Sequence, residues 1–223
     1  MMSNLNILIM GVAGSGKGTM SKFIKDYFDI PHISTGDMFR RAIASKTELG
    51  IKAESYIIKG LLVPDDITIA MIKSRLLQDD CQNGYLLDGF PRTLPQAKAF
   101  EDIARETNRP IKIVIDLEVE MSALAPRIVN RRSCKNCGAI YNTVTLPSKV
   151  EGICDLCGNS LVHRSDDTFE GLQVRINEHQ KLTNPVLEYF QKEGLVIKVD
   201  AGRSVEEVWL DIKKALEDLD DHN

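Results

Sequence analysis

Short apolar runs alternate along the chain with segments in which apolar residues recur every three or four positions. The first run ends at Gly11, and the segment that follows has apolar side chains at Met20, Phe23, Ile24 and Tyr27. This period near 3.6 predicts a helix at residues 17–28, whereas the short apolar runs predict buried strands. We expect these strands at residues 5–10, 85–87, 111–115 and 195–199. Because a helical segment follows each of them, the pattern predicts an α/β fold whose parallel sheet is covered by helices on both faces.

Two stretches interrupt this alternation. Residues 34–63 have only helical patterns, with a helix cap at Ser34 to Asp37 and a turn at Gly60. Residues 130–167 are rich in cysteine, glycine and polar side chains, which suits small strands and turns. We interpret both as insertions into one core, which then comprises residues 1–33, 64–129 and 168–223. The last long helix before the C-terminal strand, residues 166–190, should kink or end near Pro185, which lacks a backbone N–H.

Composition excludes several classes of protein. The chain has 223 residues, 43% of them apolar, and its 28 basic and 32 acidic side chains give a net charge of -4. This length supports a core without disulfides, and the acidic balance opposes general nucleic-acid binding, which needs clustered cations. No apolar run approaches the roughly 20 residues of a membrane-spanning helix, and no basic residue precedes Lys17 as a secretory signal would require. We therefore expect a soluble, cytoplasmic protein and take a monomer as the default.

The sequence GVAGSGKGT, residues 11–19, is a glycine-rich turn between an expected strand and an expected helix. Such a turn directs backbone N–H groups and the positive end of the helix dipole at one anion, and Lys17 adds a mobile cation. The usual motif has Ser or Thr directly after the lysine, but Gly18 occupies that position and the hydroxyl comes one residue later, at Thr19. The placement favours a nucleoside triphosphate site over a merely flexible turn.

Asp88 follows the apolar run at residues 85–87. A carboxylate at the end of a buried strand is a common ligand for magnesium, directly or through water. The alternative is a helix-capping aspartate before Thr93. The sequence has no Asn-Lys-x-Asp motif, which disfavours a switch GTPase.

Further motifs connect these features. HISTGDMFRRA, GLLVPDD, LLDGFPRTLPQA, RIVNRR and RSDD follow the loop in the order and spacing of adenylate kinases, and the sequence resembles that family over essentially its whole length. The four cysteines of the second insertion are similar to those of its long, zinc-bearing form. The resemblance implies a P-loop nucleoside monophosphate kinase fold with a five-stranded sheet, an AMP-binding insertion at residues 34–63 and a zinc-binding lid at residues 130–167. It also implies reversible transfer of the terminal phosphoryl group from ATP to AMP, giving two ADP, with Mg2+ bound to ATP.

Two nucleotides that meet through their phosphates bring roughly five or six negative charges together, so catalysis must be mainly electrostatic. Arginine suits this role because its planar fork binds phosphate oxygens and stays protonated. The catalytic residues implied by the resemblance are Lys17, Arg40, Asp88, Arg92, Arg127, Arg131, Arg164 and Arg175. Their spacing places Arg127 and Arg131 four positions apart on an expected helix, where they should share one face.

The resemblance also divides residues between the two nucleotides. Thr35 and Gln96 would read the adenine of AMP, and Arg203 would meet ATP through its backbone. The AMP set is Thr35, Arg40, Leu61, Leu62, Val63, Gly89, Phe90, Pro91, Arg92, Gln96, Arg164 and Arg175. The ATP set is Gly14, Ser15, Gly16, Lys17, Gly18, Thr19, Arg127, Arg131, Ile140, Tyr141 and Arg203. Asp166 and Asp167 would hinge or latch the lid through ion pairs, or else begin a helix.

This reaction needs no general base, because the second pKa of a phosphate near ~6 leaves the attacking oxygen of AMP largely ionised at neutral pH. The histidines form no pattern with a carboxylate or a serine, so we expect structural or solvated roles for His32, His163, His179 and His222.

Four cysteines form two C-x-x-C-G patterns separated by sixteen residues: Cys134, Cys137, Cys154 and Cys157. Four thiolates favour structural zinc, with a single iron as the lesser possibility, and reduced thiols or disulfides are the alternatives. A metal would also replace the core that so short an insertion lacks. Cys81 stands alone, and we expect a buried, inert thiol.

Two other functions remain open at this point. The same fold could phosphorylate a different nucleoside monophosphate, which Thr35, Gln96 and the zinc lid argue against. A P-loop module whose zinc ribbon binds nucleic acid is disfavoured by the net charge and by the sequence NTVTLPSKVEG, which has one lysine and no aromatic residue for base stacking.

Overall fold

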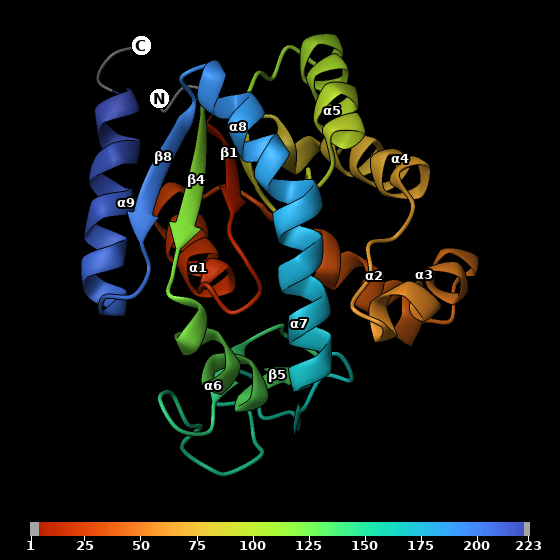
Figure 1. Ribbon diagram of the computed structural model, residues 1–223, viewed down its shortest axis with the longest axis vertical. Coiled ribbons are helices and arrows are strands. Elements are labelled where there is room, and N and C mark those ends of the chain that lie inside the picture. Colours follow the sequence, from red (N-terminus) through yellow and green to blue (C-terminus); the bar gives the residue numbers. More distant parts are fainter. Residues whose placement is uncertain (1–4, 221–223) are drawn as a thin grey trace.

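The computed structural model describes residues 5–220 of the chain (Figure 1). Within this range, five parallel strands form a sheet of order β2-β3-β1-β4-β8. The strands are β1 (Leu5–Met10), β2 (His32–Ser34), β3 (Gly84–Asp88), β4 (Ile113–Glu118) and β8 (Val196–Asp200). The register pairs Ile9 of β1 with Asp88 of β3 on one side and with Ile115 of β4 on the other. The carboxyl ends of β1, β3 and β4 therefore meet at one edge of the sheet.

Helices cover both faces of this sheet, because alternate side chains of a strand point to opposite faces. Ile7 and Ile9 of β1 pack with α1 (Lys17–Phe28) and α9 (Val205–Asp220). Leu8 and Met10 pack on the other face with α4 (Asp65–Leu76), α5 (Leu94–Glu106) and α8 (Asn184–Lys192). The central strand is buried along its whole length, as the apolar run at residues 5–10 predicted.

The first insertion consists of α2 (Thr35–Ala44) and α3 (Glu48–Ile58). Ser34 caps α2, since its hydroxyl accepts a hydrogen bond from the Asp37 N–H, and Gly60 turns the chain after α3 with a positive φ of 71°. In Figure 1 the two helices project to the right of the sheet. Both predictions for this stretch, the cap and the turn, are confirmed.

The second insertion contains a small antiparallel sheet of order β6-β5-β7. Its strands are β5 (Arg131–Cys134), β6 (Ile140–Asn142) and β7 (Leu161–Val162), and it follows the short helix α6 (Leu124–Val129). Tyr141, Cys134 and Cys154 form its buried centre. It lies at the lower end of the molecule in Figure 1, below α7 (Phe169–Glu178).

The prediction that Arg127 and Arg131 share a helix face is wrong. Helix α6 ends at Val129, and Arg131 begins strand β5, where it pairs with Asn142. Cross-strand pairing within the cysteine-rich insertion thus prevails over continuation of a helix that already contains Pro126.

The remaining elements are short. The interruption predicted near Pro185 is present: α7 ends at Glu178, and the wider π-helical turn η3 (His179–Thr183) precedes α8. Residues 5–220 also contain two 3-10 turns, η1 (Asp79–Cys81) and η2 (Met121–Ala123). No helix within residues 5–220 combines the length and apolarity needed to cross a bilayer. His222 lies outside the described residues.

Candidate active site

The glycine-rich loop leaves β1 at Met10 and enters α1 at Lys17. Gly11, Gly14 and Gly16 all adopt positive φ angles, between 90° and 134°, which residues with a Cβ rarely adopt. Gly14, Gly16, Lys17 and Gly18 carry backbone N–H groups with no protein acceptor within residues 5–220. These donors, together with the amino end of α1, form a site suited to an anion.

Lys17 folds back over this loop. Its Nζ donates to the carbonyl oxygens of Gly11 at 2.6 Å and Val12 at 3.0 Å. Burial lowers the pKa of Lys17 to about 8, although the charge of Asp88 acts in the opposite direction. Arg92, Arg131 and Arg175 lower this pKa further, which shows that these cations converge on the loop. An anion bound here would stabilise the charged form of the lysine.

Asp88 lies at the carboxyl end of β3, facing the loop. His32 of β2 contacts it, with 3.4 Å between Nε2 and Oδ2. Burial alone would raise the pKa of Asp88, but the hydrogen bond with His32 and the charge of Lys17 bring it below its ordinary value. Asp88 is therefore a carboxylate at neutral pH, and the contact with His32 agrees with a structural role for that histidine.

His179 also fits the expected structural role. Its Nε2 is buried without a partner among the described residues, and burial, followed by the charges of Lys17 and Arg92, lowers its pKa to about 4. The ring is therefore neutral at pH 7. It lies in the π-helical turn η3 between α7 and α8.

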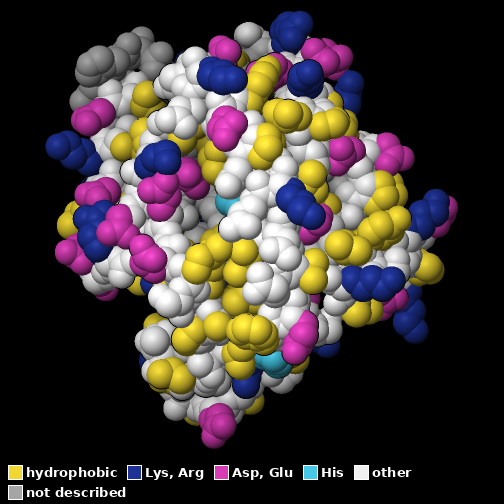
Figure 2. Space-filling view, viewed as in Figure 1, with side chains coloured by type: hydrophobic (Ala, Val, Ile, Leu, Met, Phe, Trp, Pro, Cys, Tyr) yellow, Lys and Arg dark blue, Asp and Glu magenta, His cyan; other side chains and the backbone are white. Residues whose placement is uncertain are grey.

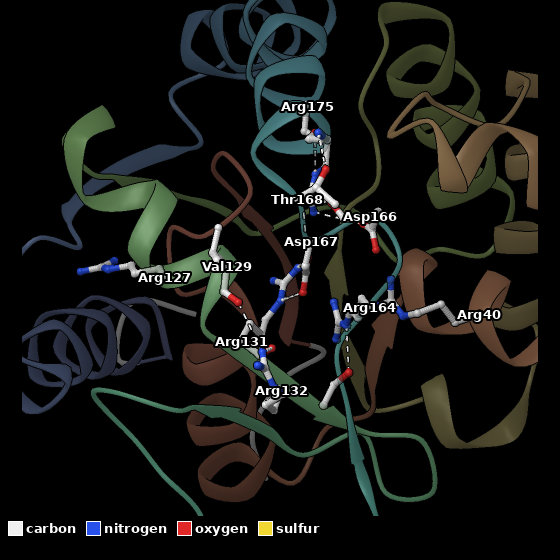
Figure 3. A network of polar contacts seen from close by, with 12 residues as sticks. Arg40, Arg127, Val129, Arg131, Arg132, Arg164, Asp166, Asp167, Thr168 and Arg175 are labelled. Atoms are coloured by element: carbon white, nitrogen blue, oxygen red, sulfur yellow. Dashed lines mark hydrogen bonds and ion pairs between the residues drawn. The ribbon is translucent and has the colours of Figure 1, made fainter. Parts of the chain in front are cut away.

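Partly buried arginines from several elements surround the loop, and two aspartates balance part of their charge (Figure 3). Asp167 is fully buried and accepts two hydrogen bonds from Arg131, one from Nε at 2.7 Å. Arg175 of α7 contacts the same carboxylate at 3.5 Å and donates to Asp166 Oδ2 at 3.1 Å. The predicted ion pairs of Asp166 and Asp167 are therefore present, and they connect β5 of the second insertion with α7.

Arg164 and Arg92, unlike Arg131 and Arg175, form no ion pair with a carboxylate among the described residues. Arg164 donates to the Ser133 hydroxyl at 3.2 Å, and its pKa falls to about 10 through burial and through the charges of Arg40 and Arg131. Arg92 donates from Nε to the Gly89 carbonyl at 2.9 Å, and burial lowers its pKa as well. Several guanidinium groups held together in this way have a strong electrostatic preference for polyanions.

Arg127 lies apart from this network (Figure 3). Its guanidinium donates to the carbonyl oxygens of Gly14 at 3.4 Å and Ala201 at 3.1 Å. It therefore bridges the glycine-rich loop and the turn after β8. Arg203 on that turn directs its side chain to Asp211, which leaves its backbone beside Ala201.

The first insertion contributes Thr35 and Arg40. Thr35 donates from its hydroxyl to the Gly89 carbonyl at 2.9 Å, and Arg40 pairs with Asp37 at 2.5 Å. A Cβ added at Gly60 would lie 3.2 Å from the Gly171 carbonyl of α7, so the chain that leads into residues 61–63 passes close to that helix. Of these three residues, Leu61 is exposed and Val63 is buried. Phe90, Pro91 and Gln96 are also buried.

Strand β6 places its first two side chains in different surroundings. Ile140 reaches the amino end of α1, where its Cδ1 would lie 2.7 Å from a Cβ at Gly18. Tyr141 points into the insertion: its hydroxyl lies 3.5 Å from Cys154 Sγ and accepts the Asp155 N–H at 2.8 Å. The structure therefore places Ile140 beside the loop and Tyr141 beside the cysteines.

The four predicted cysteines converge, and their sulfur atoms all lie within 4.8 Å of one another. Cys134 and Cys157 are 3.4 Å apart and Cys137 and Cys154 are 3.5 Å apart, too far for disulfide bonds. Hydrogen bonds from the Asn159 backbone and side chain lower the pKa of Cys157 to about 5, which favours a thiolate. This cluster could bind a metal ion. Cys81, by contrast, is buried and its pKa is raised by burial, as predicted.

Sequence reasoning missed two polar residues of this region. His32 contacts Asp88, and Asp65 at the start of α4 contacts Thr93 and Gln96. Both lie within quoted motifs, HISTGDMFRRA and GLLVPDD, but the motifs do not reveal these contacts, because each residue acts through a partner distant in the chain.

Comparisons with known proteins agree with this geometry. The sequence model of the family described as adenylate kinase matches residues 9–195. The chain is 45% identical over 212 residues to an adenylate kinase of Bacillus pumilus, covering 95% of this chain and 98% of that protein. It is 48% identical to an adenylate kinase of Thermosipho africanus, covering 92% and 95% of the two chains. For an adenylate kinase of Archaeoglobus fulgidus the identity is 43%, with 96% and 99% covered.

Proposed function

The chain belongs to the adenylate kinase family, and from this premise we propose that its glycine-rich loop and converging arginines hold ATP and AMP with their phosphates facing each other. The reaction is reversible transfer of the terminal phosphoryl group of ATP to AMP, giving two ADP. The observation that carries the proposal is the convergence of Lys17, Arg92, Arg131 and Arg175 on the loop. Among the described residues, Asp166 and Asp167 form ion pairs with Arg131 and Arg175, whereas Lys17 and Arg92 have no ion pair. Two nucleotides supply the missing negative charge.

We assign ATP to the side of the loop and α1. The unpaired N–H groups of the loop bind its phosphates, and the ammonium group of Lys17 contacts the phosphoryl group that is transferred. Arg127, which already spans the loop and the turn at Ala201, holds the nucleoside end together with the backbone near Arg203. Ile140 of the second insertion lies against the amino end of α1 at Gly18, so we place it in the lid that covers ATP. The buried ring of Tyr141 supports that cover from within.

We assign AMP to the side of the first insertion. Thr35, the segment of residues 61–63, the Gly89 turn and Gln96 surround its nucleoside, while Arg40 and Arg92 take its phosphate. Arg164 and Arg175 face the transferring group. Residues 34–63 then serve as the AMP-binding domain and residues 130–167 as the lid, with the remaining residues as the core.

The side chains need only align and neutralise the reacting groups. The attacking oxygen of AMP is ionised at neutral pH, so no residue has to remove its proton. The arginines stabilise charge that develops on the equatorial oxygens, because they are fixed in position before the reaction begins. Closure of the two insertions excludes water, which would otherwise accept the phosphoryl group.

Asp88 fits a role toward Mg2+. It is an ionised carboxylate at the carboxyl end of β3, beside the lysine of the phosphate loop. When bound with ATP, Mg2+ neutralises phosphate charge, and Asp88 would hold it directly or through water. His32 keeps the carboxylate in place.

The cysteine cluster fits structural zinc. Four sulfur ligands at about 2.3 Å from a tetrahedral ion lie roughly 3.8 Å apart, close to the separations of 3.4 and 3.5 Å between its two nearest pairs. All four positions are protein ligands, so the ion would stabilise the lid without entering the chemistry. Metal analysis of purified protein tests this assignment, and less than about half an equivalent of zinc would contradict it.

We further propose a cytoplasmic monomer that does not bind nucleic acid. Cysteines in the reduced form needed for metal binding are typical of a reducing compartment. A surface that binds nucleic acid has its basic side chains clustered in a patch or band. On the face shown in Figure 2, basic side chains are instead interspersed with acidic ones.

Arg92→Ala tests the site assignment. Because Arg92 lies where two anions meet, turnover in a coupled assay of ADP formation should fall by at least about a hundredfold, as expected for loss of one preorganised charge. The melting temperature should change little. Arg105→Ala, an exposed arginine of α5, is the control and should keep full activity. An active Arg92 variant would refute the assignment, and faster turnover with CMP, UMP or GMP than with AMP would favour a different acceptor.

A further inference from the structure

A ring of hydrogen bonds joins the start of α4 to the start of α5, where the first insertion returns to the core. Asp65 uses both carboxylate oxygens: Oδ2 accepts from the Thr93 hydroxyl at 2.9 Å, and Oδ1 accepts from Gln96 Nε2 at 2.7 Å. The Thr93 oxygen in turn accepts from the Gln96 N–H at 3.2 Å. Gln96 is only 2% exposed, so water does not compete for these bonds.

The other end of the Gln96 amide is also fixed. Its Oε1 accepts a hydrogen bond from the Arg92 N–H at 2.8 Å. A carboxylate can only accept a hydrogen bond and a backbone N–H can only donate one. The amide of Gln96 therefore has one permitted orientation, with its nitrogen toward Asp65 and its oxygen toward Arg92. Asp65 and the Arg92 N–H together fix this orientation, and Asp65 does so from a distant part of the sequence.

After these bonds are made, the amide keeps one N–H and one oxygen lone pair for a ligand. Their order matters, because adenine presents an N–H donor at N6 beside an acceptor at N1, whereas guanine presents an acceptor at O6 beside a donor at N1. An amide can match either base, but only in opposite orientations. An orientation that cannot invert can therefore discriminate between the two bases.

We propose that Asp65 is a positioning residue that makes the acceptor site select adenine over guanine, by adding to the Arg92 N–H a second contact that prevents inversion of the Gln96 amide. This inference rests on the proposed function, in which Gln96 faces the base of AMP. It adds a specificity role for a residue that does not itself touch the nucleotide. It also links base recognition to the first residue of α4, beside the junction with the insertion that closes over AMP.

A purely structural role would have a different signature. Thr93 and Gln96 stand at the cap and third positions of α5, where a Thr-x-x-Gln pair commonly caps a helix. If the ring only stabilised this helix start, its loss would lower the melting temperature and affect every acceptor equally. A role in base selection changes the ratio between acceptors.

Asp65→Asn separates these roles, because the amide of asparagine can present either a donor or an acceptor to Gln96. We expect kcat/KM for AMP to fall and the preference for AMP over GMP to drop by about tenfold or more, the effect of one mispaired buried polar group. The KM for ATP should stay within about twofold. Asp66→Asn is the matched control, since Asp66 is an exposed acid in the same first turn, and it should leave every value unchanged.

Two further variants complete the test. Asp65→Glu retains a group that only accepts, so it should keep the preference for AMP even where turnover falls. If Asp65→Asn does not fold, Asp65→Ser answers the same question, because a hydroxyl both donates and accepts. An unchanged AMP to GMP ratio in the asparagine or serine variant overturns the proposal. If the ratio also survives Gln96→Ala, the assignment of Gln96 to the base fails, and that failure is distinguishable from failure of Asp65 alone.

Discussion

Lys17 carries a charge that the fold disfavours until an anion arrives, and this should be measurable as a dependence of stability on pH. Burial lowers its pKa from 10.5 to about 8 in the folded protein. At about 1.4 kcal/mol per pKa unit, the protonated lysine costs the folded state about 3 kcal/mol at neutral pH. The unfolded chain binds the proton more tightly, so stability should rise between pH 8 and pH 10.5 as the folded lysine loses its charge.

The variant Lys17→Met removes this charge, and the comparison of two pH values isolates its contribution. The variant also loses the hydrogen bonds to Gly11 and Val12, and this loss is nearly the same at both pH values. The attraction between Lys17 and Asp88 is already contained in the folded-state pKa of about 8. The difference in the free energy of unfolding, wild type minus variant, should therefore increase by about 2 kcal/mol from pH 7 to pH 10.

Urea unfolding followed by tryptophan fluorescence measures this difference. Trp209 of α9 is the only tryptophan in the sequence, and it packs against Phe23 and Tyr27 of α1. Lys22→Met is the matched control, because Lys22 is an exposed residue of the same helix, and its curves should stay parallel to those of the wild type. A wild-type-minus-variant difference that is equal at pH 7 and pH 10 would refute the burial of a charged lysine. Addition of ATP at pH 7 should shift the wild type toward higher stability by mass action.

Two further predictions concern the insertions. Asp167→Asn leaves Arg131 and Arg175 with a neutral partner in a fully buried position. Urea unfolding should show that the free energy of unfolding falls by about 3 to 5 kcal/mol. The control Glu170→Gln, at an exposed position, should not change it. Gly50→Ala should destabilise the protein by about 1 to 3 kcal/mol and raise the KM for AMP, although alanine favours helices, because the new Cβ would lie 2.2 Å from the Ala42 carbonyl. A stabilised Gly50 variant would contradict the close contact of α2 and α3.

The alternation of strands and helices could be predicted because each central strand is buried on both faces and reads as one apolar run. The bounds of β4 were harder to predict. The strand expected at residues 111–115 lies at residues 113–118, because pairing with β1 begins only at Ile113. Strand β2 has three residues, His32 to Ser34, too few for any periodicity to appear. Its position is set by pairing with β3, which is a long-range interaction.

The residues of the candidate site also fall into those that a local sequence pattern predicts and those that depend on long-range contacts. Residues whose role depends on local backbone geometry, such as the glycines of the loop and the paired cysteines, form contiguous patterns that predict their chemistry. Arg131 has a role that depends on the strand it joins, and the helical spacing to Arg127 led to the wrong element. Asp65 and His32 act by orienting Gln96 and Asp88, and a single sequence contains no signal for such a partnership.

Gly18 departs from the usual motif at a position that a distant segment of the chain approaches closely. In most loops of this kind the residue after the lysine carries a hydroxyl toward the metal. Here a Cβ at position 18 would lie 2.7 Å from the Cδ1 of Ile140, which β6 brings from the second insertion onto the amino end of α1. A side chain at this position would therefore displace the end of the Ile140 side chain. In the proposed function, the phosphate loop would accordingly bind through its backbone and Lys17, while Asp88 on a neighbouring strand would supply the carboxylate for the metal.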